Sequence, residues 1–373
     1  MQRIEELIDA ALAAGLGSAI AVSVGDGGRE VYAAHRGHTR RVPDLGAPID
    51  EHTRFDIASL TKPMVTAACA MVLVRHGRLA LAAPVRDHVP EAATTGTVRD
   101  LLGHAAGCLP HVEFFRAMQA GSRDPRAELV ERAAREPASA PGITAVYSDL
   151  GYILLGEVIA RAAGLPLEQA FAALVGGPLG LGARYVASTE PALAEPAVVA
   201  TELDVPGAAT THSVLPSDAR AGATHRGLVV GRAHDENAYF GGGVCGHAGL
   251  FATLGDVARF AAAVVTGSGP FDAAIVETCA TTAAAPGTSW RLGWDTPSAT
   301  PGSSHAGDRW PRSGVIGHLG FTGTSLWLDL PRRRWVALLT NRVHPTRLAG
   351  SADAIKALRR AVHDAAVSAL ADR

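Results

Sequence analysis

The chain has 373 residues, of which 47% are apolar and 19% charged, a composition typical of globular proteins and unlike that of disordered chains. Its 34 basic and 36 acidic residues give a net charge of -2, so no basic excess is present to neutralise phosphates, and we expect no nucleic-acid partner. Four cysteines without a Cys-x-x-Cys pair are too few for a disulfide framework.

The first predicted elements are a helix and a hairpin. Residues 2–15 carry apolar side chains at helical spacing, which predicts an amphipathic helix. Residues 18–26 and 29–37 predict two strands joined by an Asp-Gly-Gly turn. The early residues are acidic where a signal peptide needs positive charge, and no segment is apolar enough to span a membrane. We therefore expect a cytoplasmic protein with no membrane partner.

The middle of the chain predicts mainly helices. Residues 39–54 are polar, contain two prolines and predict a loop, after which the apolar run 59–77 predicts a helix. Between residues 97 and 180, helical patterns alternate with Gly and Pro, and residues 255–267 predict another helix. The range 186–230 shows weak periodicity, and we expect it to form a long irregular excursion.

The C-terminal part predicts strands again, followed by a closing helix. Residues 324–330 and 335–341 predict two strands joined by a turn, and residues 351–373 predict a long amphipathic helix. Strands from both ends of the chain can share one antiparallel sheet that the terminal helices cover. We expect an α+β fold, in which residues 1–58 and 285–373 form an α/β sheet domain and residues 59–284 form an inserted, mostly helical domain.

The sharpest local signal for chemistry is the Ser59-x-x-Lys62 spacing at the start of a predicted helix. Residues at positions i and i+3 of a helix share a face, so this spacing holds a hydroxyl beside an amine. A serine becomes a nucleophile when a neighbouring base accepts its proton, and a partly desolvated lysine can be that base. Lys62 and Lys356 are the only lysines among 34 basic residues, and lysine, unlike arginine, can be deprotonated near neutral pH. The alternative interpretation is a helix-capping serine with a surface lysine.

Two further segments carry candidate site residues. Tyr147 precedes a predicted helix, and a tyrosine hydroxyl beside a lysine can act as a general acid or base. The alternative is a packed tyrosine with Asp149 as the helix cap. Residues 317–323 contain three glycines in a strand-like setting, which permits close approach of a ligand or another backbone. Such a strand can offer a backbone N–H to an oxyanion, with His318 facing a cleft.

Taken together and in this order, the three segments resemble the Ser-x-x-Lys, Tyr-x-Asn and Lys/His-Thr-Gly boxes of the serine β-lactamases and penicillin-binding proteins. The resemblance spans roughly residues 18 to 370 and looks closest to the class C-like branch, which includes esterases, D-amino-acid peptidases and transacylases. It implies a β-lactamase/transpeptidase-like fold, in which a helical domain is inserted into an α/β domain and the active site lies in the cleft between them.

The resemblance also implies roles for individual residues. Ser59 would be the acylated nucleophile, and Lys62 and Tyr147 would share the proton transfer. The oxyanion hole would consist of the backbone N–H groups of Ser59 and Phe321. His318 would occupy the Lys/His position of the third box on the cleft strand.

The sequence departs from the family pattern at two positions. Asp149 stands where many members have Asn, and because a carboxylate only accepts hydrogen bonds, we expect Asp149 to pair with Lys62. Leu319 replaces the Thr of the third box and removes a hydroxyl that antibiotic-recognising members use toward a substrate carboxylate. Both changes favour an ester or an unusual amide over a penicillin. Asp149, His318 and Gly320 are expected to face the substrate in the cleft.

A metal site and a cofactor are not expected. Cys108 and His111 have the spacing of metal ligands, but no second pair at zinc spacing accompanies them. His104 and His247 are expected to buttress loops, and residues 234–239 to form a structural loop or part of the cleft rim.

We therefore expect a cofactor-independent serine hydrolase that cleaves a small ester or amide through an acyl-enzyme on Ser59. Three alternatives stay open: an acyltransferase on the same machinery, a D-alanyl carboxypeptidase or β-lactamase, and a catalytically silent ligand-binding relative. The intact Ser, Lys and Tyr argue against the last of these. The sequence leaves the acyl group, its acceptor and the oligomeric state open.

Overall fold

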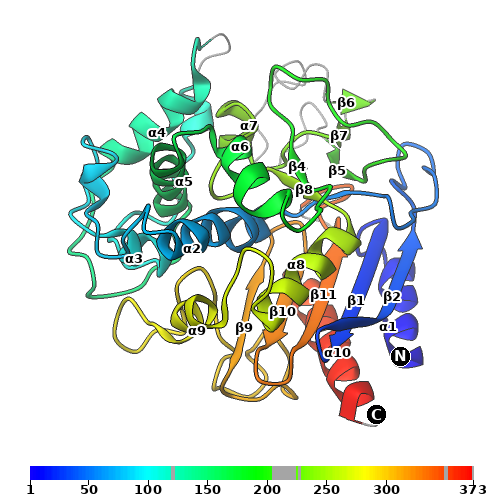
Figure 1. Ribbon diagram of the computed structural model, residues 1–373. Helices are drawn as coiled ribbons and strands as arrows, with labels where there is room; N and C mark the ends of the chain where they lie inside the picture. Colours follow the sequence, from blue (N-terminus) through cyan, green and yellow to red (C-terminus); the bar gives the residue numbers. More distant parts are fainter. Residues whose placement is uncertain (119–121, 204–223, 226–227, 348–351, 372–373) are drawn as a thin grey trace.

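The computed structural model describes residues 1–118, 122–203, 224–225, 228–347 and 352–371 (Figure 1). Its largest sheet is antiparallel and five-stranded, in the order β2-β1-β11-β10-β9. The strands are β1 (Ala19–Asp26), β2 (Arg29–Gly37), β9 (Val315–Leu319), β10 (Ser325–Asp329) and β11 (Arg334–Thr340). Strands from the two ends of the chain meet where β1 pairs with β11, and both predicted hairpins are present.

Helices cover both faces of this sheet. Side chains along a strand alternate between the two faces, so β1 contributes to two cores. Val22 packs in one core with the terminal helices α1 (Gln2–Ala13) and α10 (Ala352–Ala371). Ala21 faces the opposite core, where α8 (Leu254–Thr266) packs against β1 and β11. Figure 1 shows α8 across the sheet, with α1 and α10 on the far side.

The remaining helices lie mostly to one side of the sheet and of α8 (Figure 1). They are α2 (Ala68–Arg75), α3 (Val98–Leu102), α4 (Pro125–Arg135), α5 (Asp149–Ala163), α6 (Leu167–Phe171), α7 (Glu236–Phe240) and α9 (Ala273–Thr281). Shorter 3-10 or π segments span Ala58–Leu60, Lys62–Ala67, Val85–Asp87, Phe114–Arg116 and Ala172–Gly176. The nearly continuous apolar sequence of α5 is explained by its position, because it is buried along most of its length and contacts α3, α4 and α6.

Two small antiparallel sheets complete the fold. One is formed by β3 (Phe55–Asp56), β8 (Leu250–Ala252) and β4 (Arg184–Tyr185). The other is formed by β5 (Ala200–Leu203), β7 (Leu228–Val230) and β6 (Thr224–His225). The expectation of an irregular excursion over 186–230 is wrong for β5 and β7, which pair with each other. Residues 204–223 of that range lie outside the described residues.

The α+β class and the sheet with its covering terminal helices agree with the prediction from the sequence. The division into domains at residues 58/59 and 284/285 stays a prediction, and one helix within 59–284, α8, packs on the large sheet. No single helix of the described chain is long and apolar enough to cross a membrane. One bent pair, Asp149–Ala163 with Leu167–Gly176, passes the same test by length and composition alone.

Candidate active site

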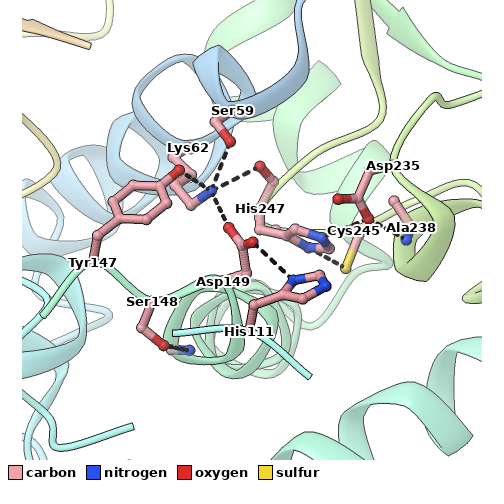
Figure 2. A network of polar contacts seen from close by, with 12 residues as sticks. Ser59, Lys62, His111, Tyr147, Ser148, Asp149, Asp235, Ala238, Cys245 and His247 are labelled. Atoms are coloured by element: carbon pink, nitrogen blue, oxygen red, sulfur yellow. Dashed lines mark hydrogen bonds and ion pairs between the residues drawn. The ribbon is translucent and has the colours of Figure 1, made fainter. Parts of the chain in front are cut away.

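Ser59 and Lys62 lie where two short helical segments meet. Ser59 is in the 3-10 turn Ala58–Leu60, and Lys62 begins the π-helix Lys62–Ala67, which continues into α2. The single helix predicted over 59–77 is therefore a succession of three helical types. The Nζ of Lys62 lies 3.0 Å from the Oγ of Ser59, so the i, i+3 spacing does bring the amine beside the hydroxyl (Figure 2).

The turn before Ser59 is held in a strained conformation. Ala58 has a φ of 48°, in the left-handed region that residues with a side chain seldom adopt. The Asp56 carboxylate accepts hydrogen bonds from the backbone N–H of Ala58 at 2.8 Å and from the backbone N–H of His234 at 2.7 Å. Asp56 is fully enclosed, and burial raises the pKa of its carboxyl. The sequence analysis did not select Asp56, although it lies three residues before Ser59.

The buried Nζ of Lys62 is the centre of a polar network (Figure 2). It lies 2.7 Å from the Tyr147 hydroxyl, 2.7 Å from Oδ1 of Asp149 and 3.2 Å from the His247 carbonyl oxygen. With Ser59 this makes four acceptors for the three N–H groups of an ammonium, so at least one N–H is shared. The expected pairing of Asp149 with Lys62 is thus present.

Asp149 reaches this network because it opens α5. The hydroxyl of Ser148 caps the helix by accepting a hydrogen bond from the Gly151 N–H at 3.0 Å, so the alternative that Asp149 is the cap is wrong. The carboxylate is therefore free to bridge two basic side chains: its Oδ1 contacts Lys62, and its Oδ2 lies 3.4 Å from Nδ1 of His111. The hydrogen bond to Asp149 is the largest influence on His111 and raises its pKa.

Two histidines support the network, as expected. His104 accepts a hydrogen bond from the Ser148 N–H at 3.1 Å, and its ring packs against the Tyr147 ring, with centroids 4.7 Å apart. The ring of His247 lies 2.9 Å from Oδ1 of Asp235, which also caps α7. The contact of His104 holds the backbone between Tyr147 and Asp149, and the contact with Asp235 holds His247, whose carbonyl oxygen lies next to the Nζ of Lys62.

The charges of the network oppose the activation of Ser59 at low pH. Burial acts to lower the pKa of Lys62, but the neighbouring Asp149 and Tyr147 outweigh it, and the net shift is upward. Burial acts to raise the pKa of Asp149, but Lys62 and His111 outweigh it, and this carboxyl stays ionised. Burial raises the pKa of Tyr147, and Lys62 offsets this only in part. The resting site therefore holds an ammonium, a carboxylate and a neutral phenol.

The third box forms β9 and the turn 320–324 that follows it. Gly320 fits only without a side chain, because a Cβ there would lie 2.0 Å from Oγ1 of Thr324 and 2.5 Å from the Ile57 carbonyl oxygen. The hydroxyls of Thr322 and Thr324 donate to the carbonyls of Asp56 and Ile57 at 2.8 and 3.0 Å. This turn is therefore fastened to the segment that leads into Ser59.

Within the described residues, the N–H of Phe321 in this turn has no hydrogen-bond acceptor. His318, on β9, is buried, and burial lowers its pKa to about 3, so the ring is neutral. Its Nδ1 lies 2.8 Å from the Leu319 carbonyl oxygen and must donate to it, which leaves Nε2 as an acceptor. That Nε2 has no partner among the described residues.

A cavity of about 770 Å³ joins these groups. The predicted site residues that line it are Ser59, Tyr147, Asp149, His318, Gly320 and Phe321. Lys62 is fully buried beside Ser59 and Tyr147. The sequence analysis considered His111 only as a metal ligand, and it missed other lining residues, among them Trp290, Asp295, Arg342 and Arg347. Within the described residues, no group of three or more His, Cys, Asp or Glu side chains is placed to hold a metal ion.

Residues 4–360 of the chain match the Beta-lactamase family, and the chain belongs to this family. It is a serine hydrolase of the β-lactamase-related type, as the sequence predicts. A putative D-alanyl-D-alanine carboxypeptidase of Escherichia coli (strain K12) is 28% identical over 317 residues, which cover 78% of this chain and 70% of the relative. An N-acetylmuramyl-L-alanine amidase of Bacillus subtilis (strain 168) is 27% identical over 378 residues, which cover 92% and 81%.

The fold is also that of solved relatives. The structure of EstCE1, described as a hydrolase with promiscuous acyltransferase activity, matches with a TM-score of 0.69 at 22% identity, over 97% of this chain and 98% of the other. The predicted β-lactamase/transpeptidase-like fold is therefore confirmed.

Proposed function

We propose that the protein hydrolyses a small carboxylic ester or amide through an acyl-enzyme on Ser59. The contact that carries this proposal is the 3.0 Å approach of the buried Lys62 Nζ to the Ser59 Oγ at the wall of the cavity. A hydroxyl held beside a buried amine, with a phenol 2.7 Å from the same amine, is an arrangement that can activate a serine. The cavity has the volume of a small-molecule site.

In the first step, the Oγ of Ser59 attacks the substrate carbonyl carbon, and its proton passes to the pair formed by Lys62 and Tyr147. Because Asp149 holds Lys62 as an ammonium, this pair accepts the proton only when it has already lost one. The oxyanion that forms on the carbonyl oxygen would bind the N–H groups of Ser59 and Phe321. The intermediate then collapses, the bond to the leaving group breaks, and the pair returns the proton to that group.

In the second step, a water attacks the acyl carbonyl, gives up a proton to the same pair and releases the carboxylic acid, while Ser59 regains its proton. An alcohol or amine that takes the place of water would make the same machinery an acyltransferase. The neutral Nε2 of His318 and the carboxylate of Asp149 offer acceptors, so they suit a substrate that presents N–H or O–H groups.

Esters and amides are both candidate substrates. Two relatives are named as an amidase and as a putative D-alanyl-D-alanine carboxypeptidase, which supports including amides. Asp149 replaces the Asn donor and Leu319 replaces the hydroxyl-bearing Thr of the third box, so we favour an ester or an unusual amide over a penicillin. A cytoplasmic location and the lack of nucleic-acid and membrane partners stay predictions from the sequence.

The test is turnover of a substrate panel by the wild type and by Ser59→Ala. The panel contains p-nitrophenyl esters, nitrocefin and D-alanyl dipeptides. We expect the wild type to hydrolyse at least one ester or dipeptide and Ser59→Ala to lose that activity. Equal turnover by both proteins would overturn the assignment of the nucleophile.

A further inference from the structure

Three side chains that the proposed mechanism does not use form a Cys–His–Asp cluster beside the active site (Figure 2). Nδ1 of His247 lies 3.1 Å from the sulfur of Cys245, and its Nε2 lies 2.9 Å from Oδ1 of Asp235. Because an ionised carboxylate only accepts hydrogen bonds, Nε2 carries a proton, and Nδ1 is the atom that can take the proton of the thiol. The three groups therefore stand in the order of a nucleophile, its base and the group that orients the base.

The charges of this cluster favour the loss of the thiol proton. Burial acts to raise the pKa of Asp235, but His247 outweighs it and lowers the pKa to about 2, so Asp235 is a carboxylate. Burial acts to lower the pKa of His247, but Cys245 and Asp235 outweigh it, and the net shift is well upward. An imidazole with a raised pKa can hold the proton of a neighbouring thiol, and the thiolate that remains is the nucleophilic form of cysteine.

The other three cysteines lie in a different environment. Burial raises the pKa of the Cys108 thiol to about 11 and that of the Cys279 thiol to about 12, and it also raises the pKa of Cys69. Among the described residues, no imidazole or carboxylate lies within hydrogen-bond distance of these three sulfurs, whereas Cys245 has His247. Cys108 is nevertheless the most exposed of the four. Exposure and activation by a base therefore favour different cysteines.

Access to Cys245 is narrow. The residue is 5% exposed and lines a crevice of about 10 Å³ between α4, α5 and α6. A crevice of this volume holds about one water-sized molecule, so it excludes bulky thiol reagents. Hydrogen peroxide is close to water in size and polarity. The reagent that this geometry admits is therefore a small hydroperoxide.

The backbone of the cluster is bound to the helix that carries Lys62. Figure 2 shows the His247 carbonyl directed toward Lys62 and the His247 ring directed toward Cys245. The next carbonyl, that of Gly246, accepts a hydrogen bond from the Thr66 hydroxyl at 2.6 Å. Gly246 has little room to move, because a Cβ there would lie 2.2 Å from a carbonyl oxygen of α5. An oxygen atom added to the sulfur would therefore displace the His247 ring and, with it, the carbonyl that contacts Lys62.

We propose that Cys245 is an oxidation site for small hydroperoxides, and that its conversion to a sulfenic acid lowers the activity of Ser59. The sulfur attacks one peroxide oxygen, an S–O bond forms and the O–O bond breaks, so that the sulfur is oxidised and the peroxide reduced. The leaving hydroxide takes the proton held by His247 and departs as water. A thiol reductant reverses the change. The modification itself does not depend on the proposed function, and only its effect on turnover does.

The test treats four proteins with hydrogen peroxide: the wild type, Cys245→Ser, Asp235→Asn and the control Cys108→Ser. Serine is similar to cysteine in size and does not oxidise, and asparagine keeps the helix cap that Asp235 provides for α7. Each sample is then unfolded in dimedone, which captures sulfenic acids, and iodoacetamide, which captures thiols. Peptide mass spectrometry gives the oxidised fraction of each cysteine. Turnover of one p-nitrophenyl ester is measured before peroxide, after it and after dithiothreitol.

We expect Cys245 to be oxidised before the more exposed Cys108, in parallel with the loss of turnover, and dithiothreitol to restore both. Cys245→Ser should keep its turnover under peroxide, Cys108→Ser should behave as the wild type, and Asp235→Asn should be oxidised about 10-fold more slowly.

Three results would overturn the proposal: earlier oxidation of Cys108, full turnover of wild type in which Cys245 is oxidised, or loss of turnover in Cys245→Ser at the wild-type rate. The order of oxidation in the wild type and in Asp235→Asn tests the site even if Cys245→Ser does not fold. The mass measurement needs no substrate, so it tests the modification even if Ser59→Ala shows that the proposed function fails.

Discussion

The Oδ1 atom of Asp149 lies 2.7 Å from the Nζ atom of Lys62, and this ion pair sets the charge at the centre of the candidate active site. A carboxylate at this position favours the ammonium form of Lys62 and disfavours the ionised form of Tyr147, so it acts to raise the pKa of both groups. Relatives with Asn at the equivalent position carry no such charge.

The substitution Asp149→Asn removes this charge and nearly keeps the shape of the side chain. Because the pKa values of Lys62 and Tyr147 should then fall, we expect the acidic limb of kcat/KM to move to lower pH. The amide also restores a donor, so the rate on nitrocefin should improve relative to that on an ester. The measurement is a pH–rate profile of both proteins on one ester. An unmoved limb, or one moved to higher pH, would show that Asp149 does not act on the base.

The substitution Lys62→Arg tests whether a proton acceptor or only a positive charge is needed. A guanidinium keeps the charge but does not deprotonate in proteins, so we expect kcat to fall nearly as far as in Ser59→Ala. Steady-state kinetics on one ester, with Tyr147→Phe beside it, measures the effect. Wild-type rates in Lys62→Arg would mean that the lysine supplies only a positive charge. Tyr147 would then be the proton acceptor, and Tyr147→Phe should be the more severe change.

Much of the large sheet follows from the sequence, because its hairpins carry both the residue types and the turns of strands, and helical spacing alone places Ser59 beside Lys62. The short strands β3 and β4 have two residues each and give no periodic signal. The contacts of Asp149 with His111 and of Arg342 with Phe321 join segments far apart in the chain, so only the folded arrangement shows them. The amphipathic pattern of α8 likewise predicts a buried face without predicting that the sheet covers it.

The substitution Gly320→Ala tests the link between the turn 320–324 and the oxyanion hole. A Cβ at this position would meet the Ile57 carbonyl oxygen at 2.5 Å, so the turn must move and carry the Phe321 N–H with it. We expect kcat to fall on the order of 10²-fold, as for loss of one oxyanion donor, and the free energy of unfolding to fall by about 1–3 kcal/mol.

Kinetics and denaturant unfolding of Gly320→Ala, beside Gly255→Ala, measure these two effects. Gly255 lies in the first turn of α8, where the nearest atom to a new Cβ is 3.5 Å away, so this control should keep both activity and stability. Full activity in Gly320→Ala would show that the turn 320–324 does not position the oxyanion donor.

The central claim is that Ser59 carries the acyl group, and a fluorophosphonate tests it most directly, because such a reagent forms a stable bond only with an activated serine. Intact-mass and peptide-mass spectrometry of the wild type should show one added group, located on the peptide that contains Ser59. Ser59→Ala should gain no mass under the same conditions. An adduct on a different residue, or equal labelling of Ser59→Ala, would contradict the account.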